Sequence, residues 1–194
     1  MMRHVYKSHI QKLGFEFLEY YSGGRNPVYR VTDGIDDFIL KMRYKKYGWP
    51  IWNENRILQR TTGIPFVAQR HDYFEVKDNL RDIWDNLRSG FEFYWFSTVS
   101  ILKDFIPGNR LTDFVNDTEM QCRLVDSLRS IHNAGICRIE IRQDQMVQTP
   151  EGTVYYIDLG YGSLRDEIDD EKSFLRGVDW DQRCLHKNIF GEKV

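Results

Sequence analysis

The sequence predicts an α+β fold with two lobes, an antiparallel sheet in the first and helices in the second. Three observations predict it. The first 45 residues alternate strand-like and turn-like segments, apolar side chains recur at helical spacing beyond residue 111, and Pro107-Gly108-Asn109 separates the two patterns. The lobes are therefore expected at residues 1–106 and 107–194, together forming one domain.

The first lobe is expected to begin with three antiparallel strands joined by turns rich in Gly, Asn and Asp. These strands are predicted at 15–21, 28–31 and 38–42. A helix over 51–59 follows and ends before Gly63-Ile64-Pro65. Later segments are predicted as a helix-containing insertion at 77–90 and a hairpin of 91–96 with 98–102.

The second lobe is expected to be mainly helical. Helices are predicted at 111–115, at 120–131 and from about Asp169 onward, and Gly135 ends the second of them. A hairpin around Pro150-Glu151 interrupts this series, with strands on either side of the turn at 149–152.

The composition excludes several classes of protein. Of 194 residues, 41% are hydrophobic and 29% charged, the net charge is -2, and no long basic tract points to nucleic acid. The three cysteines are far apart, which argues against a disulfide framework or a zinc site. The chain lacks a signal-peptide pattern at its N-terminus and an apolar run of about 18 residues, so we expect a cytoplasmic protein that does not span a membrane.

The hairpin places two oxygen-bearing side chains together. If residues pair symmetrically about position 151, Gln145 lies opposite Ile157, and Asp158 follows at the same open end. A carboxylate and an amide oxygen in this arrangement are the hard ligands that Mg²⁺ prefers. The alternative is that Asp158 only caps the following turn.

The segment from His132 to Gly160 resembles the catalytic segment of protein-kinase-like enzymes. In that family a helix ends in a Leu-His-x-x-Gly-Ile pattern, followed by His-x-Asp-x₄-Asn, a turn and Asp-Phe-Gly. The matching features here are His132-Asn133-Ala134-Gly135-Ile136, Glu140, Gln145 and Asp158-Leu159-Gly160, with the family's spacing. The compact chain resembles the atypical branch that contains lipopolysaccharide core heptose kinases and RIO-like kinases.

Motifs of the first lobe follow in the family's order. The loop at Gly24 resembles a shortened nucleotide-covering loop, and Phe38-Ile39-Leu40-Lys41 resembles the strand with the phosphate-binding lysine. Glu54 lies where the family has that lysine's partner. Residues 101–108 resemble the hinge that meets adenine, which implicates Lys103, Asp104 and Phe105.

The resemblance implies a phosphotransferase that uses ATP and Mg²⁺. Lys41 would contact the α and β phosphates, and Gln145 and Asp158 would bind the metal. Glu140 would take the place of the catalytic aspartate, and Arg142 that of a loop lysine near the transferred phosphate. Lys41 alone, however, is also compatible with a surface lysine at a strand end.

Two substitutions distinguish this chain from the family pattern. Glu140 and Gln145 stand where the family has Asp and Asn, so each functional group is displaced by about 1.5 Å. A displacement of ~1 Å can lower a rate on the order of 10²-fold. Two hypotheses follow: a kinase acting on a sugar or another hydroxyl, favoured by the few residues after Gly160, and a pseudokinase that binds a nucleotide or a protein partner.

Overall fold

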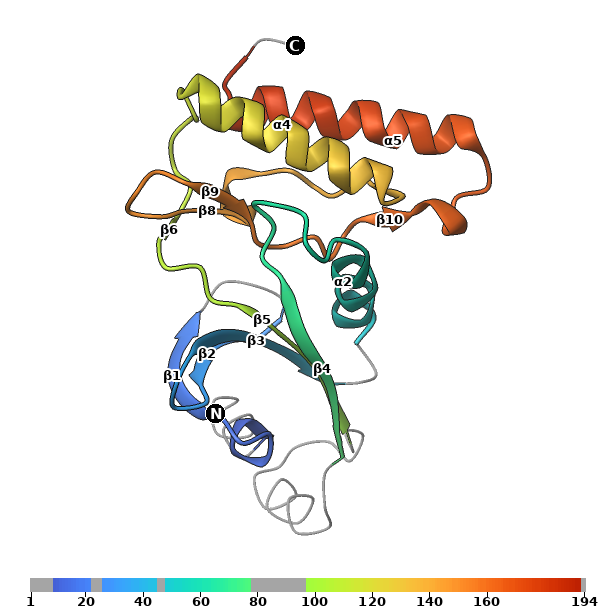
Figure 1. Ribbon diagram of the computed structural model, residues 1–194. Coiled ribbons are helices and arrows are strands. Elements are labelled where there is room, and N and C mark those ends of the chain that lie inside the picture. Colours follow the sequence, from blue (N-terminus) through green and yellow to red (C-terminus); the bar gives the residue numbers. More distant parts are fainter. Residues whose placement is uncertain (1–8, 22–25, 45–47, 78–96, 193–194) are drawn as a thin grey trace. The chain divides into compact units, whose positions relative to one another are not determined.

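The computed structural model describes residues 9–21, 26–44, 48–77 and 97–192 (Figure 1). The chain divides into two compact units. Unit 1 comprises residues 1–52 and 70–105, and unit 2 comprises residues 53–69 and 106–194. The predicted α+β fold class is confirmed, because a five-stranded antiparallel sheet is combined with several helices. Within the described residues, no helix combines the length and the apolar composition needed to cross a membrane.

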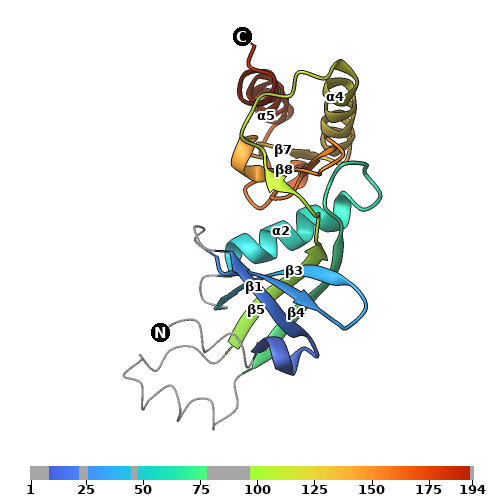
Figure 2. The same cartoon turned by 90° about the vertical axis from the view of Figure 1, so that its left-hand side faces the viewer.

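Unit 1 is built on one antiparallel sheet with the strand order β1-β2-β3-β5-β4 (Figures 1 and 2). The strands are β1 (Glu16–Tyr21), β2 (Val28–Thr32), β3 (Asp37–Tyr44), β4 (Arg70–Lys77) and β5 (Ser97–Asp104). The three strands predicted at the start of the chain are confirmed as β1 to β3. The strand predicted at 98–102 is β5, which pairs with both β3 and β4. Its predicted hairpin partner at 91–96, and the insertion beyond β4, lie outside the described residues.

The two faces of this sheet differ in chemistry. Leu40 lies opposite Tyr29 on β2 and Leu102 on β5, so these three side chains share one face. They are buried in a core that is completed by Ile10, Val31 and Met42. Because side chains alternate along a strand, Lys41 lies on the other face.

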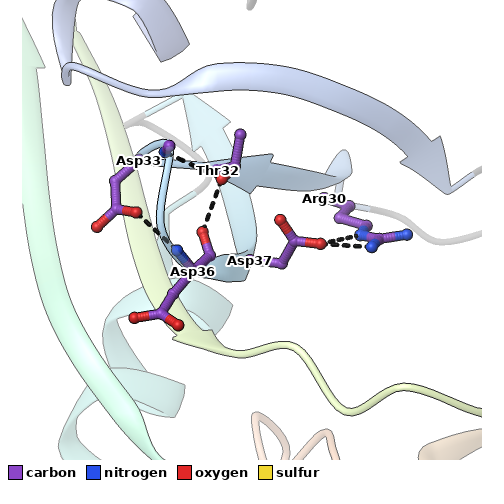
Figure 3. A network of polar contacts seen from close by, with 6 residues as sticks. Arg30, Thr32, Asp33, Asp36 and Asp37 are labelled. Carbon is purple, nitrogen blue, oxygen red and sulfur yellow. Dashed lines mark hydrogen bonds and ion pairs between the residues drawn. The ribbon is translucent and has the colours of Figure 1, made fainter.

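The turn between β2 and β3 is closed by polar contacts (Figure 3). Asp33 Oδ1 accepts hydrogen bonds from the backbone N–H groups of Ile35 and Asp36, both at 2.9 Å. These bonds, that of Asp36 foremost, hold the pKa of Asp33 below its usual value. Beside the turn, Arg30 Nε donates to Asp37 Oδ2 at 2.8 Å, which ties β2 to β3.

Unit 2 is organised around two helices that pack against each other (Figures 1 and 2). They are α4 (Thr118–Asn133) and α5 (Glu171–Cys184), which confirm the helices predicted at 120–131 and from about Asp169. Each begins at an aspartate whose side chain accepts a backbone N–H of the first turn, Asp117 for α4 and Asp170 for α5. The predicted helix at 51–59 is confirmed as α2 (Trp49–Arg60).

Short strands precede α4 or lie between α4 and α5. One sheet has the order β6-β8-β9 and a second pairs β10 with β7. Their bounds are β6 (Asn109–Arg110), β7 (Ile136–Cys137), β8 (Met146–Gln148), β9 (Val154–Tyr156) and β10 (Ser163–Leu164). Gly108 precedes β6, and only glycine fits there, because a Cβ would lie 2.2 Å from the carbonyl oxygen of Gln148.

The short helix predicted at 111–115 does not form. Its backbone donors bond to distant partners instead, Leu111 N–H to the carbonyl of Met146 at 3.1 Å and Val115 N–H to that of Ile189 at 2.8 Å. Leu111 and Val115 are both buried in these extended positions. Long-range pairing therefore replaces the local helical bonds that their spacing suggested.

Candidate functional site

The segment that carries Glu140 and Arg142 runs between β7 and the 3₁₀ turn η2 (Gln143–Gln145) of unit 2. Ile139 and Ile141 are buried, whereas the side chains of Glu140 and Arg142 remain accessible to solvent. Glu140 has a left-handed backbone conformation, with φ 48°, which is uncommon for a residue other than glycine. This alternation directs the two hydrophobic side chains into unit 2 and the two charged ones outward.

Two buried or half-buried polar side chains hold this segment in place. Asp181 of α5 accepts a hydrogen bond from the backbone N–H of Ile139 at 3.0 Å, and its other oxygen lies 3.2 Å from Nε2 of His132. Asn188 donates to the carbonyl of Ile141 at 2.8 Å. Contacts on both sides of Glu140 thus fix its backbone.

The sequence of the C-terminal helix offers Asp179 as an anchor for this loop, but the structure gives that contact to Asp181. Asp179 is exposed and pairs with Arg183 one helical turn along α5. Asp181, two residues later, is fully buried and makes the contact instead. The apolar stripe of the helix indicates its buried face, and Asp181 follows Phe174 and Gly177 on that face.

Arg142 is the centre of a charged cluster. Its Nη1 donates to Glu140 Oε1 at 2.9 Å, while Nε and Nη2 donate to the two carboxylate oxygens of Asp144 at 2.9 and 3.1 Å. The hydrogen bonds that Arg142 donates to Asp144, opposed by desolvation and assisted by the charge of Glu140, raise the pKa of Arg142 above its usual value. The guanidinium is therefore a fixed positive charge with a defined orientation.

Gln145 and Asp158 lie together at the open end of the β8–β9 hairpin, as the sequence predicts. Met146 is paired with Tyr156, and the backbone N–H of Ile157 donates to the carbonyl of Gln145 at 3.0 Å. The end of the Gln145 amide that faces Asp158 lies 3.3 Å from Oδ2. The other carboxylate oxygen, Oδ1, accepts the backbone N–H of Gly160 at 3.1 Å.

This pair fits a magnesium ion that retains other ligands. Two oxygen atoms bound at right angles to one octahedral Mg²⁺ lie about 3 Å apart, close to the 3.3 Å between Asp158 Oδ2 and the facing end of the Gln145 amide, provided that this end is turned to present its oxygen. Among the described residues, no three His, Cys, Asp or Glu side chains gather as they would in a metal site made by protein alone. Two protein ligands suit Mg²⁺, which commonly keeps waters and phosphate oxygens.

Helix α2 supports the segment after Asp158 through residues 53–60. Asn53 donates to the carbonyl oxygens of Gly160 and Gly162 at 3.0 and 2.9 Å, in a buried position. Farther along, Arg60 pairs with Asp166 at 2.7 Å. Asn53 was missed by sequence reasoning, although a polar residue beside the buried stripe of the helix is a usable signal.

Glu54 of the same helix is also brought to this region. It is fully buried, and its Oε2 lies 3.4 Å from the point that a Cβ on Gly160 would occupy. Asp158 Oδ1 lies 3.2 Å from that point. Unit 2 therefore gathers five of the predicted site residues: Glu54, Glu140, Arg142, Gln145 and Asp158.

Unit 1 holds the remaining described candidates. Lys41 on β3 and Lys103 on β5 are both buried, and they share a face of the sheet because Lys41 lies opposite Ile101 and Lys103 opposite Ile39. Gly24 lies outside the described residues. The two lysines are thus two ammonium groups on one face, opposite to the apolar core.

The three residues matched to the hinge have different surroundings. Lys103 and Asp104 belong to β5 and are paired with Ile39 and Phe38 on β3. The Asp104 carboxylate lies 2.6 Å from Nε2 of His71. Phe105 follows the strand, and the Arg30 guanidinium lies 4.1 Å from its ring centroid, at cation–π distance.

Comparison with known proteins points to kinases over part of the chain. No protein-family signature matches it. Over 123 residues it is 24% identical to the serine/threonine-protein kinase PAK 5 of Rattus norvegicus and to that of Mus musculus, a match that covers 59% of this chain. The match spans only 16% of the length of these relatives. This similarity indicates a distant kinase-like relationship.

Proposed function

We propose that the chain is a kinase-like phosphotransferase that binds ATP with Mg²⁺ and acts on a hydroxyl group. The observation that carries the proposal is that the side chains of Gln145 and Asp158 lie 3.3 Å apart in unit 2, next to the ion pair of Glu140 and Arg142. A metal-binding pair beside an accessible carboxylate is the arrangement that phosphoryl transfer to a hydroxyl requires. The kinase-like relationship supports the same reaction class.

Each residue would have a separate role. Asp158 and Gln145 would hold Mg²⁺, which when bound supplies positive charge to the phosphate oxygens. Lys41 would contact the α and β phosphates as a compact cation, and Glu54 would orient groups near Asp158. Glu140 would accept or orient the proton of the attacking hydroxyl. We further propose that residues 1–106 and 107–194 form the two lobes of a kinase-like domain, a division that differs from units 1 and 2 mainly in residues 53–69, which belong to unit 2.

The three residues matched to the hinge, Lys103, Asp104 and Phe105, are proposed to differ in their role toward adenine. Lys103 is paired with both β3 and β4, and Asp104 with β3, so both residues belong to the sheet. Phe105 lies beyond the strand, and its backbone is the better candidate for adenine. The acceptor is proposed to be a sugar, with a protein hydroxyl as the alternative class.

A pseudokinase is the second candidate, favoured by the state of Glu140. Its carboxylate is bound to Arg142 at 2.9 Å, and its backbone has the left-handed conformation. An ion pair to a guanidinium restricts how this carboxylate can turn toward an attacking hydroxyl group. In that case the chain would bind nucleotide without transferring phosphate.

The test begins with binding. The melting temperature is measured with ATP in excess Mg²⁺ and with ATP in EDTA, since a ligand of the folded state raises it. We expect stabilisation that depends on Mg²⁺ and is lost in Asp158→Asn. Asp166→Asn is the matched control, because Asp166 is an exposed carboxylate of unit 2 that pairs with Arg60.

Transfer is then measured with γ-labelled ATP and a panel of sugar and protein acceptors. Label transfer by the native chain and none by Asp158→Asn identifies the phosphotransferase. Magnesium-dependent binding without transfer or hydrolysis identifies the pseudokinase. Absence of any nucleotide effect on the melting temperature would refute both.

A further inference from the structure

The amide of Gln145 is held between a cation and an anion. Its two ends find suitable partners in one orientation: the nitrogen donates to Asp158 Oδ2 at 3.3 Å, and the oxygen accepts from Nη2 of Arg142 at 3.0 Å. Arg142 is itself fixed by Glu140 and Asp144. The charged cluster thus determines which atom of the amide faces Asp158.

This orientation is the wrong one for a metal ion. Mg²⁺ is bound by oxygen, whereas the atom of Gln145 beside Asp158 is the nitrogen. Rotating the amide by 180° would direct its oxygen toward Asp158, but would also bring its NH₂ group against Nη2 of Arg142. Two donors would then face each other at about the distance of a hydrogen bond, without an acceptor.

We propose that Arg142 is a positioning residue that sets the orientation of the Gln145 amide and so opposes cation binding at Gln145 and Asp158. A cation held by both residues requires the contact between Arg142 and Gln145 to break. The inference rests on the proposed function, since it concerns the same metal pair. It differs from a direct contact of Arg142 with phosphate, because it assigns the residue an effect through its neighbour.

The contact between Arg142 and Gln145 can break without displacing the rest of the charged cluster. Arg142 has three further hydrogen bonds, one to Glu140 and two to Asp144. Losing the contact to Gln145 therefore leaves the guanidinium anchored close by. An anionic group that attracts Nη2 away from Gln145, such as a phosphate, would free the amide to turn. Phosphate and cation should consequently favour each other's binding.

The experiment measures Mn²⁺ binding to the full chain without nucleotide, by the loss of the free-ion electron paramagnetic resonance signal. Arg142→Ala should bind Mn²⁺ about tenfold more tightly than the native chain, since a hydrogen bond to a charged group no longer holds the amide. Removing a nearby positive charge would also raise the affinity. The same substitution is therefore made in a Gln145→Met background, where the charge effect remains and the amide is absent.

We expect the effect of Arg142→Ala to fall to about twofold in the Gln145→Met background, a difference that a double-mutant cycle isolates. A second readout is the side-chain ¹⁵N–¹H amide resonance of Gln145, assigned by its absence in Gln145→Met. In the native chain this signal should shift when Mg²⁺ binds, and in Arg142→Ala it should shift at lower Mg²⁺ concentration.

Three results overturn the inference. An equal gain in both backgrounds would show that only charge is involved. No gain in Arg142→Ala, with Mn²⁺ binding that Asp158→Asn abolishes, would refute the role of Arg142 and leave the proposed metal pair standing. If no variant binds Mn²⁺ and Mg-ATP also has no effect on melting, both the inference and the proposed function are wrong.

Discussion

Replacing Asp181 with alanine tests how the segment that carries Glu140 is held. The Asp181 side chain is fully buried, accepts the backbone N–H of Ile139 at 3.0 Å and lies 3.2 Å from Nε2 of His132. Alanine would remove both contacts and leave a buried N–H without its acceptor. Hydrogen bonds to a charged group contribute roughly 1.5–3 kcal/mol each, so we expect a loss of about 3–5 kcal/mol in the free energy of unfolding.

Thermal and urea denaturation measure this loss. For a chain of this size, 1 kcal/mol corresponds to about 2–4 °C, so the melting temperature of unit 2 should fall by roughly 6–20 °C. Asp181→Asn should lose less, because its amide oxygen can still accept the N–H of Ile139. Asp179→Ala is the matched control on the same helix, and as an exposed side chain paired with Arg183 it should change stability by about 0.5 kcal/mol or less.

The reasoning fails if the free energies of unfolding of Asp181→Ala and Asp179→Ala differ by less than about 1 kcal/mol, the typical effect of a single substitution. That result would mean that the segment from Ile139 to Glu140 is held by its buried isoleucines alone. A large loss of stability in both variants would also refute it, because the helix rather than the buried carboxylate would then be responsible.

Further predictions concern packing, pH and the lysines of unit 1. Gly177→Ala should destabilise unit 2 by about 1–3 kcal/mol in denaturant titrations, despite the better helix propensity of alanine, because the added Cβ would lie 2.5 Å from Sγ of Cys137. Burial raises the pKa of Cys137 from 9.0 to about 11. As the pH rises, the thiol therefore ionises in the unfolded chain before it does so in the folded chain. The contribution of the neutral thiol to stability is fully present below pH 9 and should be lost as the pH approaches 11. In the folded chain a thiol reagent should accordingly modify exposed Cys122 faster than Cys137. Lys41→Met should weaken nucleotide binding about tenfold or more by calorimetry, whereas Lys103→Met should have a smaller effect if only Lys41 contacts phosphate.

Much of the fold could be predicted from local pattern. The β8–β9 hairpin is the clearest case, because a turn with Pro150 and Gly152 fixes the register of its two short strands. That register alone places Gln145 opposite Ile157 and brings Asp158 beside it, as the structure confirms. Helices α4 and α5 were likewise predicted, since their buried residues recur at helical spacing.

Other features depend on contacts between distant segments, which periodicity does not reveal. Strand β4 has the sequence Arg-His-Asp-Tyr-Phe-Glu-Val-Lys, which lacks a regular alternation of polar and apolar residues, and it pairs with β5 across a long intervening stretch of chain. Residues 111–115 have helical spacing, but their backbone groups bond to β8 and to Ile189 instead. Whether Asp179 or Asp181 contacts Ile139 depends on which face of α5 packs toward β7, and this is set by tertiary packing.

The two departures from the kinase pattern are joined by a single guanidinium. Glu140 Oε1 lies 2.9 Å from Nη1 of Arg142, and the Gln145 amide oxygen accepts from Nη2 at 3.0 Å. An aspartate and an asparagine at these positions would each be shorter by one methylene, about 1.5 Å, and would fall short of those contacts with the backbone unchanged. The longer side chains of Glu140 and Gln145 are therefore coupled through Arg142 and are not two independent departures from the kinase pattern. Shortening only one of them, by Glu140→Asp or Gln145→Asn, would remove a partner of Arg142 without restoring the geometry of the kinase pattern. Only the double variant therefore compares this loop with that of a standard kinase.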